Sequence, residues 1–147
     1  MGIFSGITIL DVAQGVSGNL CTAVLSDLGA EVIHIDLPSE TIFAGETYHG
    51  VSIRELDLMR GKKRVALDLT NDRQREAFLK LAAKADAFVE DRGPDHAAAF
   101  GAGYADLIKV NPEICYTSIS FFGQTGPKRD MPASDLVMQA VSGLMSM

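Results

Sequence analysis

A short apolar segment, a helix-length segment and a second short apolar segment follow one another near the start of the chain. Residues 7–10 are apolar and end at Asp11, as expected of a buried strand. A helix is predicted over residues 19–28, ending at Gly29, and a second strand over residues 31–35. A strand–helix–strand unit of this length implies a parallel strand pair joined by a right-handed crossover. The opening of the chain therefore predicts a parallel sheet.

The same alternation continues through the rest of the sequence. Further strands are predicted over residues 64–69, 87–90 and 115–120, and further helices over residues 71–83, 104–110 and 135–147. Residues 38–60 are irregular, and we expect an ordered excursion there, because long loops in compact domains are often functional. The pattern predicts an α/β fold, in which a Rossmann-like, mostly parallel sheet is flanked by helices.

Two helix starts carry candidate capping side chains. Ser17 precedes the first predicted helix, and either Thr70 or Asn71 precedes the helix that ends near Ala83. Serine, threonine and asparagine oxygens accept hydrogen bonds from the free amides of a first helical turn. We therefore expect Ser17 to cap the first helix, and one of the other two residues to cap the later one.

Length, charge and cysteine content limit the classes of protein. With 147 residues, 47% of them hydrophobic, one domain with one core is expected. The formal net charge is −6, whereas a protein that binds duplex nucleic acid needs a basic face, so that class is disfavoured. No apolar run reaches the ~18 residues that a membrane-spanning helix needs. Cys21 and Cys115 lie in apolar runs, and we expect buried thiols in a cytoplasmic protein.

Polar segments follow several predicted strands, where ligands of open α/β sheets bind. The loop with Gly15 and Gly18 lets a ligand approach backbone amides, or it is an ordinary turn. Residues 60–64, Arg-Gly-Lys-Lys-Arg, are either a solvated loop or a phosphate site. The polar residues of 90–94, at the end of the fourth strand, are ligand groups, or else Asp91 and Arg92 are merely a turn pair or a helix cap. Asp135 is either the first-turn acid of a helix or a site carboxylate.

Taken together, these segments resemble the family III coenzyme A transferases, which are similar to formyl-CoA and carnitine CoA-transferases and include the α-methylacyl-CoA racemases. The resemblance covers nearly the whole chain. It rests on the colinear order of several segments, among them Leu-Gly-Ala-Glu-Val-Ile at 28–33, Val-Ala-Leu-Asp-Leu at 65–69 and Ser-Ile-Ser-Phe-Phe-Gly-Gln-Thr-Gly-Pro at 118–127.

The resemblance implies an enzyme that moves CoA from an acyl-CoA to a carboxylic acid, without a metal. In such enzymes an aspartate attacks the thioester, and an aspartyl-CoA intermediate follows. The family places the thioester beside the start of the first helix, and the nucleotide beside the third and fourth strand ends. The implied CoA-binding residues are Val16, Ser17, Leu67, Asp68, Leu69, Thr70, Asp91, Arg92, Gly93 and Ser134. Asp135 falls where the family places an acid near the reacting centre.

Several departures from the family pattern qualify this expectation. Family members have several hundred residues, with the nucleophilic aspartate beyond the helix that starts at Asp135. Residues 1–147 are therefore expected to be the N-terminal CoA-binding α/β domain, incomplete relative to the family and inactive alone. Asp91, Arg92 and Gly93 replace the usual Asn-Phe and basic residue. Ser134 stands where racemases carry their histidine base, so racemisation is not expected.

The expected partners follow from the same resemblance. We expect either a homo-oligomer or a complex with a C-terminal partner chain, because a cut after this segment would expose apolar surface. The alternative is a non-catalytic, degenerate family member that acts as an assembly or CoA-binding subunit.

Overall fold

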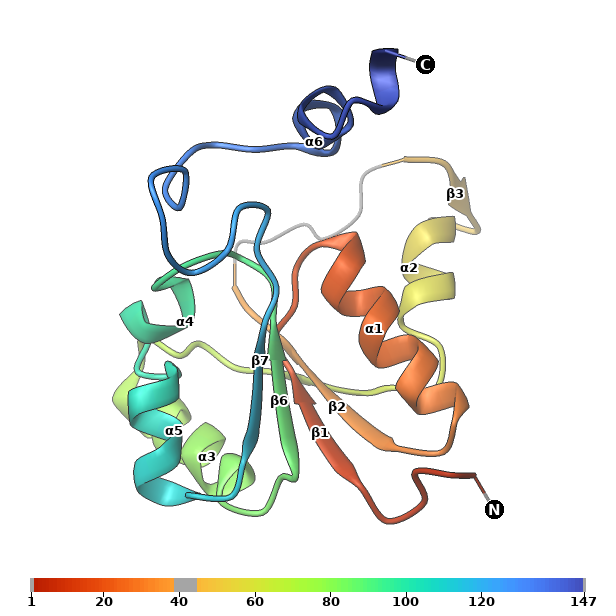
Figure 1. Ribbon diagram of the computed structural model, residues 1–147. Coiled ribbons are helices and arrows are strands. Elements are labelled where there is room, and N and C mark those ends of the chain that lie inside the picture. Colours follow the sequence, from red (N-terminus) through yellow and green to blue (C-terminus); the bar gives the residue numbers. More distant parts are fainter. Residues whose placement is uncertain (1, 39–44, 147) are drawn as a thin grey trace.

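A five-stranded parallel sheet forms the centre of the protein in the computed structural model, which describes residues 2–38 and 45–146 (Figure 1). The strand order is β5-β2-β1-β6-β7, and each neighbouring pair is parallel. The strands are β1 (Thr8–Asp11), β2 (Glu31–Asp36), β5 (Lys63–Ala66), β6 (Ala87–Glu90) and β7 (Cys115–Ser118). The predicted α/β class is confirmed.

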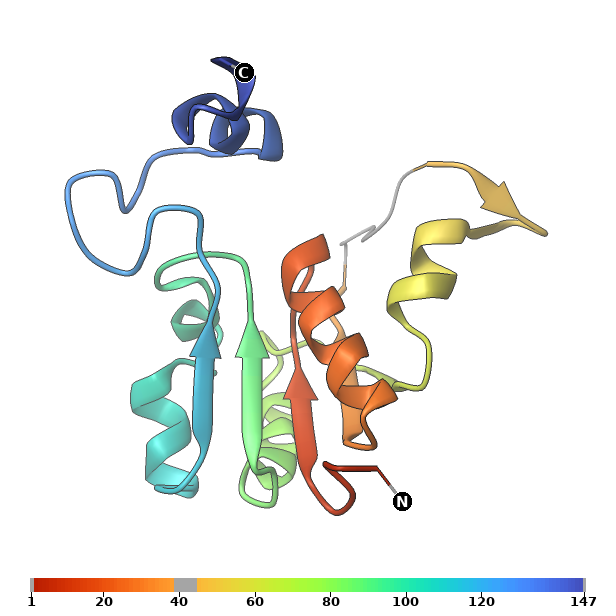
Figure 2. The same ribbon diagram turned by 45° about the vertical axis from the view of Figure 1, so that its right-hand side comes forward.

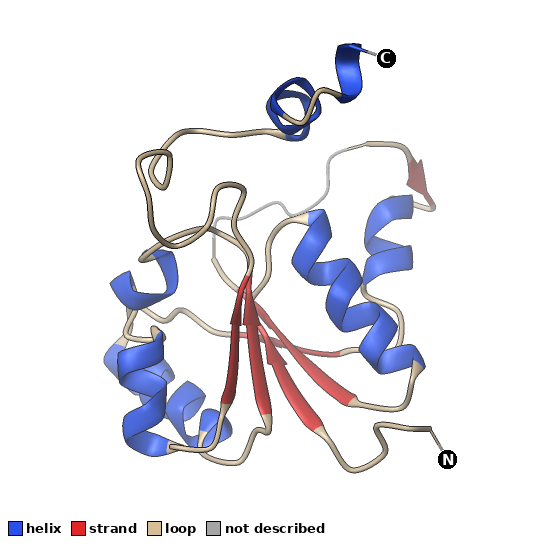
Figure 3. Ribbon diagram, in the orientation of Figure 1, coloured by secondary structure: helices blue, strands red, loops and turns tan. Residues whose placement is uncertain are grey.

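Helices cover both faces of this sheet (Figures 1 and 3). One face carries α1 (Val16–Asp27) and α2 (Ile53–Leu58), and the other carries α3 (Asp72–Ala82), α4 (His96–Ala99) and α5 (Tyr104–Val110). Because neighbouring residues of a strand point to opposite faces, Leu10 joins the core below α3 and α5, whereas Ile9 joins the core below α1. The sheet is therefore buried on both sides.

The helix caps differ in part from the prediction. Asn71 caps α3, and its Oδ1 accepts from the amides of Arg73 and Gln74 at 3.1 and 3.3 Å. The prediction for Ser17 is wrong, because α1 begins at Val16 and Ser17 lies within its first turn. Its N-cap is Gly15, which has no side chain to offer.

The remaining elements lie outside the sheet. Residues 39–44 of the predicted excursion lie outside the described residues, and the rest of it forms a hairpin, β3 (Thr47–Tyr48) and β4 (Val51–Ser52), followed by α2. The helix predicted over residues 135–147 is divided at Gly143, whose φ of 82° interrupts it. The two pieces are α6 (Asp135–Val141) and the 3₁₀ helix η1 (Leu144–Ser146). The expectation of buried thiols is wrong for Cys115, which is exposed, and Cys21 is half-buried.

The segment after β7 extends away from the sheet as an arm, residues 119–146 (Figure 2). None of the α6 residues is buried. Leu136 is 64% exposed and Leu144 is 53% exposed, so the arm presents apolar side chains to solvent. No helix among the described residues is long and apolar enough to cross a membrane.

Candidate functional site

The side chain of Asp91 joins two loops at the edge of the sheet where the strands end. Asp91 follows β6, and its carboxylate lies against the backbone that connects β1 to α1. Its Oδ1 accepts from the amides of Gln14 and Gly15 at 2.8 and 3.1 Å. Its Oδ2 accepts from the amides of Gly15 and Gly18, both at 3.0 Å. Asp91 therefore caps α1 although it is more than 70 positions away in the sequence. Its negative charge stabilises the N-terminus of this helix.

This carboxylate explains the glycine at position 15 and is one of two groups that crowd position 18. A Cβ atom at Gly15 would lie 2.7 Å from Asp91 Oδ2, and one at Gly18 would lie 2.5 Å from Ala13 Cβ and 2.8 Å from Asp91 Oδ2. Contacts this short require a shift of the loop or of the acid. The space beside the two glycines, which could have admitted a ligand, is therefore filled by the carboxylate of Asp91.

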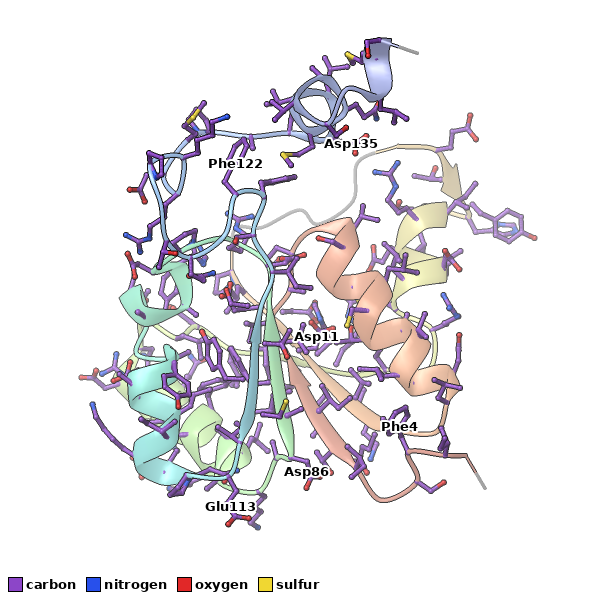
Figure 4. The ribbon with its side chains drawn as sticks, in the orientation of Figure 1. Phe4, Asp11, Asp86, Glu113, Phe122 and Asp135 are labelled. Carbon is purple, nitrogen blue, oxygen red and sulfur yellow. The ribbon has the colours of Figure 1, made fainter. Side chains whose placement is uncertain are left out.

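A buried polar network lies beneath α1, centred on Asp11 at the end of β1 (Figure 4). Asp11 Oδ2 accepts from Lys62 Nζ at 2.8 Å and from Thr22 Oγ1 at 2.7 Å. Lys62 also donates to the Asn19 carbonyl and side-chain oxygens at 3.0 and 3.1 Å. His34 Nδ1 also lies beside this carboxylate, 3.0 Å from Asp11 Oδ2. The network thus ties β1, α1 and the start of β5 together.

The two charged side chains of this network are both fully buried. Burial is the largest influence on Asp11 and raises its pKa, but His34 and Lys62 together outweigh it and hold the pKa of Asp11 below its usual value. Burial lowers the pKa of Lys62, and Asp11 offsets only part of that shift. A buried ion pair of this kind depends on both partners, because removing one leaves an uncompensated charge.

The four cations of residues 60–64 each have a carboxylate partner. Besides the buried pair, the ion pairs are Arg60 with Asp27 at 2.7 Å, Lys63 with Glu31 at 2.7 Å, and Arg64 with Asp36 at 2.7 Å and Glu55 at 2.5 Å. Neither sequence-based alternative describes this segment fully. The side chain of Lys62 is buried, so it is not part of a solvated loop. A phosphate that bound Arg60, Lys63 or Arg64 would have to displace the carboxylate that each of them already contacts.

A half-open pocket of about 390 Å³ lies where β6 and β7 end, beside α4 and α5. Glu90 is 3% exposed, accepts from the Ser118 hydroxyl and from the Arg92 amide, and lines this pocket. Burial raises the pKa of Glu90, and the bond from Ser118 offsets part of that rise. Tyr104 and Tyr116 add aromatic walls. The pocket thus combines apolar surface with Glu90, a carboxylic acid whose neutral form is favoured by burial.

The segment of residues 67–70 follows β5 at the same edge of the sheet. Asp68 accepts from the amide and the hydroxyl of Thr70 at 2.9 and 2.6 Å, and these bonds lower the pKa of Asp68. Leu67 packs partly against the core, and Leu69 is only 2% exposed. Leu69 can therefore meet a ligand only through its backbone, whereas Thr70 is exposed.

The other predicted site residues are divided between the sheet edge and the arm. Arg92 is exposed and Gly93 has a φ of 90°, which suits glycine. Ser134 caps α6 through a bond from the Val137 amide at 3.4 Å. Asp135 is exposed on the first turn of α6, and its Oδ2 accepts from Gln139 at 2.7 Å (Figure 4). The structure thus joins the β1–α1 loop to Asp91, while Ser134 and Asp135 lie on the arm.

Two features of this edge escaped the sequence analysis. The Asp11–Lys62 pair left no local signal, because its members are 51 residues apart. Asp91 was named as a ligand group or a cap, but nothing in the sequence indicates which helix it caps. In the ranges 2–38 and 45–146, no group of three or more His, Cys, Asp or Glu side chains is placed to hold a metal ion.

Comparison with protein families gives one match, which covers residues 4–147 and is described as CoA-transferase family III. The chain is 36% identical over 147 residues to the acetyl-CoA:oxalate CoA-transferase of Acetobacter aceti, covering 98% of this chain and 38% of that protein. It is 38% identical over 144 residues to the human succinyl-CoA:glutarate CoA-transferase, covering 95% of this chain and 33% of that protein. The chain thus spans between a third and two fifths of the length of these curated relatives.

Solved structures agree with these matches. A hypothetical protein of Mycobacterium tuberculosis superposes with a TM-score of 0.90 at 34% identity, over 100% of this chain and 42% of that one. A CAIB/BAIF family protein of Brucella suis superposes with a TM-score of 0.91 at 27% identity, over 99% and 40%. The fold therefore matches about two fifths of each of these longer proteins.

We expect Lys62→Met to lower the free energy of unfolding by about 3–5 kcal/mol, because it leaves Asp11 buried without its cation. Adding Asp11→Asn should recover part of this loss. The neighbouring substitution Lys63→Met is the control, since it removes an exposed ion pair worth about 0–1 kcal/mol. Urea unfolding at neutral pH gives the free energy of unfolding of the wild type and of these three variants. Equal losses for Lys62→Met and Lys63→Met would contradict the role of the buried pair.

We expect Glu90→Gln to raise the melting temperature at pH 7–8 but not near pH 4. The folded state raises the pKa of Glu90, so the folded protein holds the proton more tightly than the unfolded chain. Stability from this group is present below the usual glutamate pKa and is lost as pH rises through the folded pKa. Glutamine keeps an oxygen for Ser118 and carries no charge. Glu113→Gln, on the opposite edge of the sheet, is the control (Figure 4). A difference in melting temperature between Glu90→Gln and wild type that does not change with pH would refute this explanation.

Proposed function

The chain belongs to CoA-transferase family III, and we propose that it is the CoA-binding N-terminal part of an enzyme that moves CoA between carboxylic acids. The observation that carries this proposal is the family match over residues 4–147, with the fold of the longer relatives preserved throughout. The relatives named above act on acyl-CoA and dicarboxylic acids, to judge from their names. We propose an acyl-CoA and a carboxylic acid as the substrates here.

We propose that CoA binds along the edge where β5, β1 and β6 end. Val16 is 47% exposed on the first turn of α1, and Ser17 is exposed beside it, so both are available to flank a thioester. The exposed Thr70 and the turn at Asp68 are available to the nucleotide, and Arg92 and Gly93 close the opposite side. This placement agrees with the general position of ligands in open α/β sheets.

The chemistry we propose is covalent. An aspartate, carried by the segment that follows in the longer relatives, attacks the thioester carbonyl and displaces the CoA thiolate, giving a mixed anhydride. The thiolate then attacks the aspartyl carbonyl, releasing the first acid and forming aspartyl-CoA. The acceptor carboxylate repeats these steps in reverse. Within this scheme the present residues bind CoA and orient the thioester, and Asp135 on the arm is a candidate acid for the reacting centre.

A second candidate function is assembly without catalysis. The exposed apolar residues of the arm, among them Leu136 and Leu144, favour it. Exposed patches of this kind drive association, so we propose a homo-oligomer or a complex with a C-terminal partner chain.

The two free thiols support a reducing, cytoplasmic location, which we propose for either function.

Titration calorimetry with CoA tests the first function. We expect measurable binding that Thr70→Glu weakens about tenfold, because the new charge repels the nucleotide phosphates. Ala77→Glu is the matched control, since it adds the same charge to an exposed position of α3 two turns further on. Absence of CoA binding, or equal affinities for the two variants, would count against the proposed site. Self-association in sedimentation velocity without any CoA binding would favour the assembly role.

A further inference from the structure

We propose that Asp91 is a positioning residue of the CoA site, which holds the start of α1 in place and closes its amides to ligand anions. The proposal rests on the proposed function. It assigns Asp91 a different role from the ligand contact that the family resemblance implies. The carboxylate acts on the ligand through Val16 and Ser17, whose backbone lies between the amides that it binds.

The geometry of the carboxylate supports this assignment. Each of its two oxygens accepts two hydrogen bonds, and the donors are the amides of Gln14, Gly15 and Gly18. These are the amides at the start of α1, which no residue of its own turn caps. A carboxylate with four such contacts leaves little room for a phosphate at the same amides.

The charge of Asp91 is also matched to its surroundings. The first turn of α1 contains no acid, although the positive end of a 12-residue helix favours one. Asp91 supplies that charge from the loop that follows β6. Its field also reaches Lys62, whose ammonium group lies below the same helix. The start of α1 therefore carries its own counter-charge, and a bound CoA would place its phosphates elsewhere along the edge.

Gly15 provides a selective probe of this contact. Its φ of −93° and ψ of 174° are accessible to any residue, so alanine is not strained there. The three nearest atoms that a new Cβ would meet all belong to the Asp91 carboxyl group. Gly15→Ala should therefore push the carboxylate off the amides and disturb little else.

The experiment compares wild type, Asp91→Ala, Asp91→Asn, Gly15→Ala and the Asp91→Ala/Gly15→Ala double variant. CoA affinity is measured by calorimetry, and the Gly15 and Gly18 amides are followed by NMR. We expect Asp91→Ala and Gly15→Ala each to weaken CoA binding about tenfold. The double variant should be no weaker than Asp91→Ala. Asp91→Asn, which keeps one oxygen acceptor, should retain most of the affinity.

Formate gives a readout that a purely structural role would not produce. Asp91→Ala leaves a carboxylate-sized space lined by three amides, so sodium formate should shift the Gly15 and Gly18 resonances and restore part of the CoA affinity. Equal sodium chloride should do neither, and wild type should not respond to formate.

Unchanged CoA affinity in both Asp91→Ala and Gly15→Ala would overturn the proposal. Additive losses in the double variant would also overturn it, because the two substitutions would then act separately. If Asp91→Ala does not fold, Gly15→Ala and Asp91→Asn decide the question by the same affinities. If wild type does not bind CoA, the proposed function fails, while the formate shifts still test whether Asp91 holds these amides.

Discussion

A buried carboxylate at the end of β1 holds the functional edge of this protein together. Asp11 meets Lys62 from the segment before β5 and Thr22 from the middle of α1, and the side chains of Asp11 and Lys62 are fully buried. Taking two charges out of water costs several kcal/mol per ion, and only close pairing with further hydrogen bonds offsets that cost. The pair therefore specifies one position of α1 over the sheet. Once α1 is fixed there, its first turn lies within reach of Asp91, and the β1–α1 loop acquires a defined shape.

Local signals in the sequence predicted the framework well. Ala87–Glu90 and Tyr104–Val110 were predicted with the bounds that the structure has, because apolar runs and breaking residues mark both. Asn71 was one of two candidates for the cap of α3, and the choice between them depended on geometry alone. The parallel arrangement followed from the strand–helix–strand pattern, which admits few alternatives.

The site was less accessible to the same reasoning, and the physical cause is distance along the chain. Ser17 was the local candidate for the cap of α1, but it lies within the first turn, and Asp91 accepts from the amides there from the loop after β6. Lys62 lies in a basic run that is typical of a solvated loop, yet a single buried carboxylate removes it from solvent. Leu69 belongs to the segment that the family resemblance places at the nucleotide, but its side chain fills the core. In each case a contact between distant residues decides what the side chain does.

The central claim is that CoA lies along the edge where β5, β1 and β6 end. Backbone amide NMR of the labelled protein during a titration with CoA tests it most directly. We expect the largest shift changes in three segments, 16–18, 67–70 and 91–93, with little change at the opposite edge near Glu113. Saturable changes confined to the pocket beside Glu90, or to the arm, would place the ligand elsewhere and contradict it.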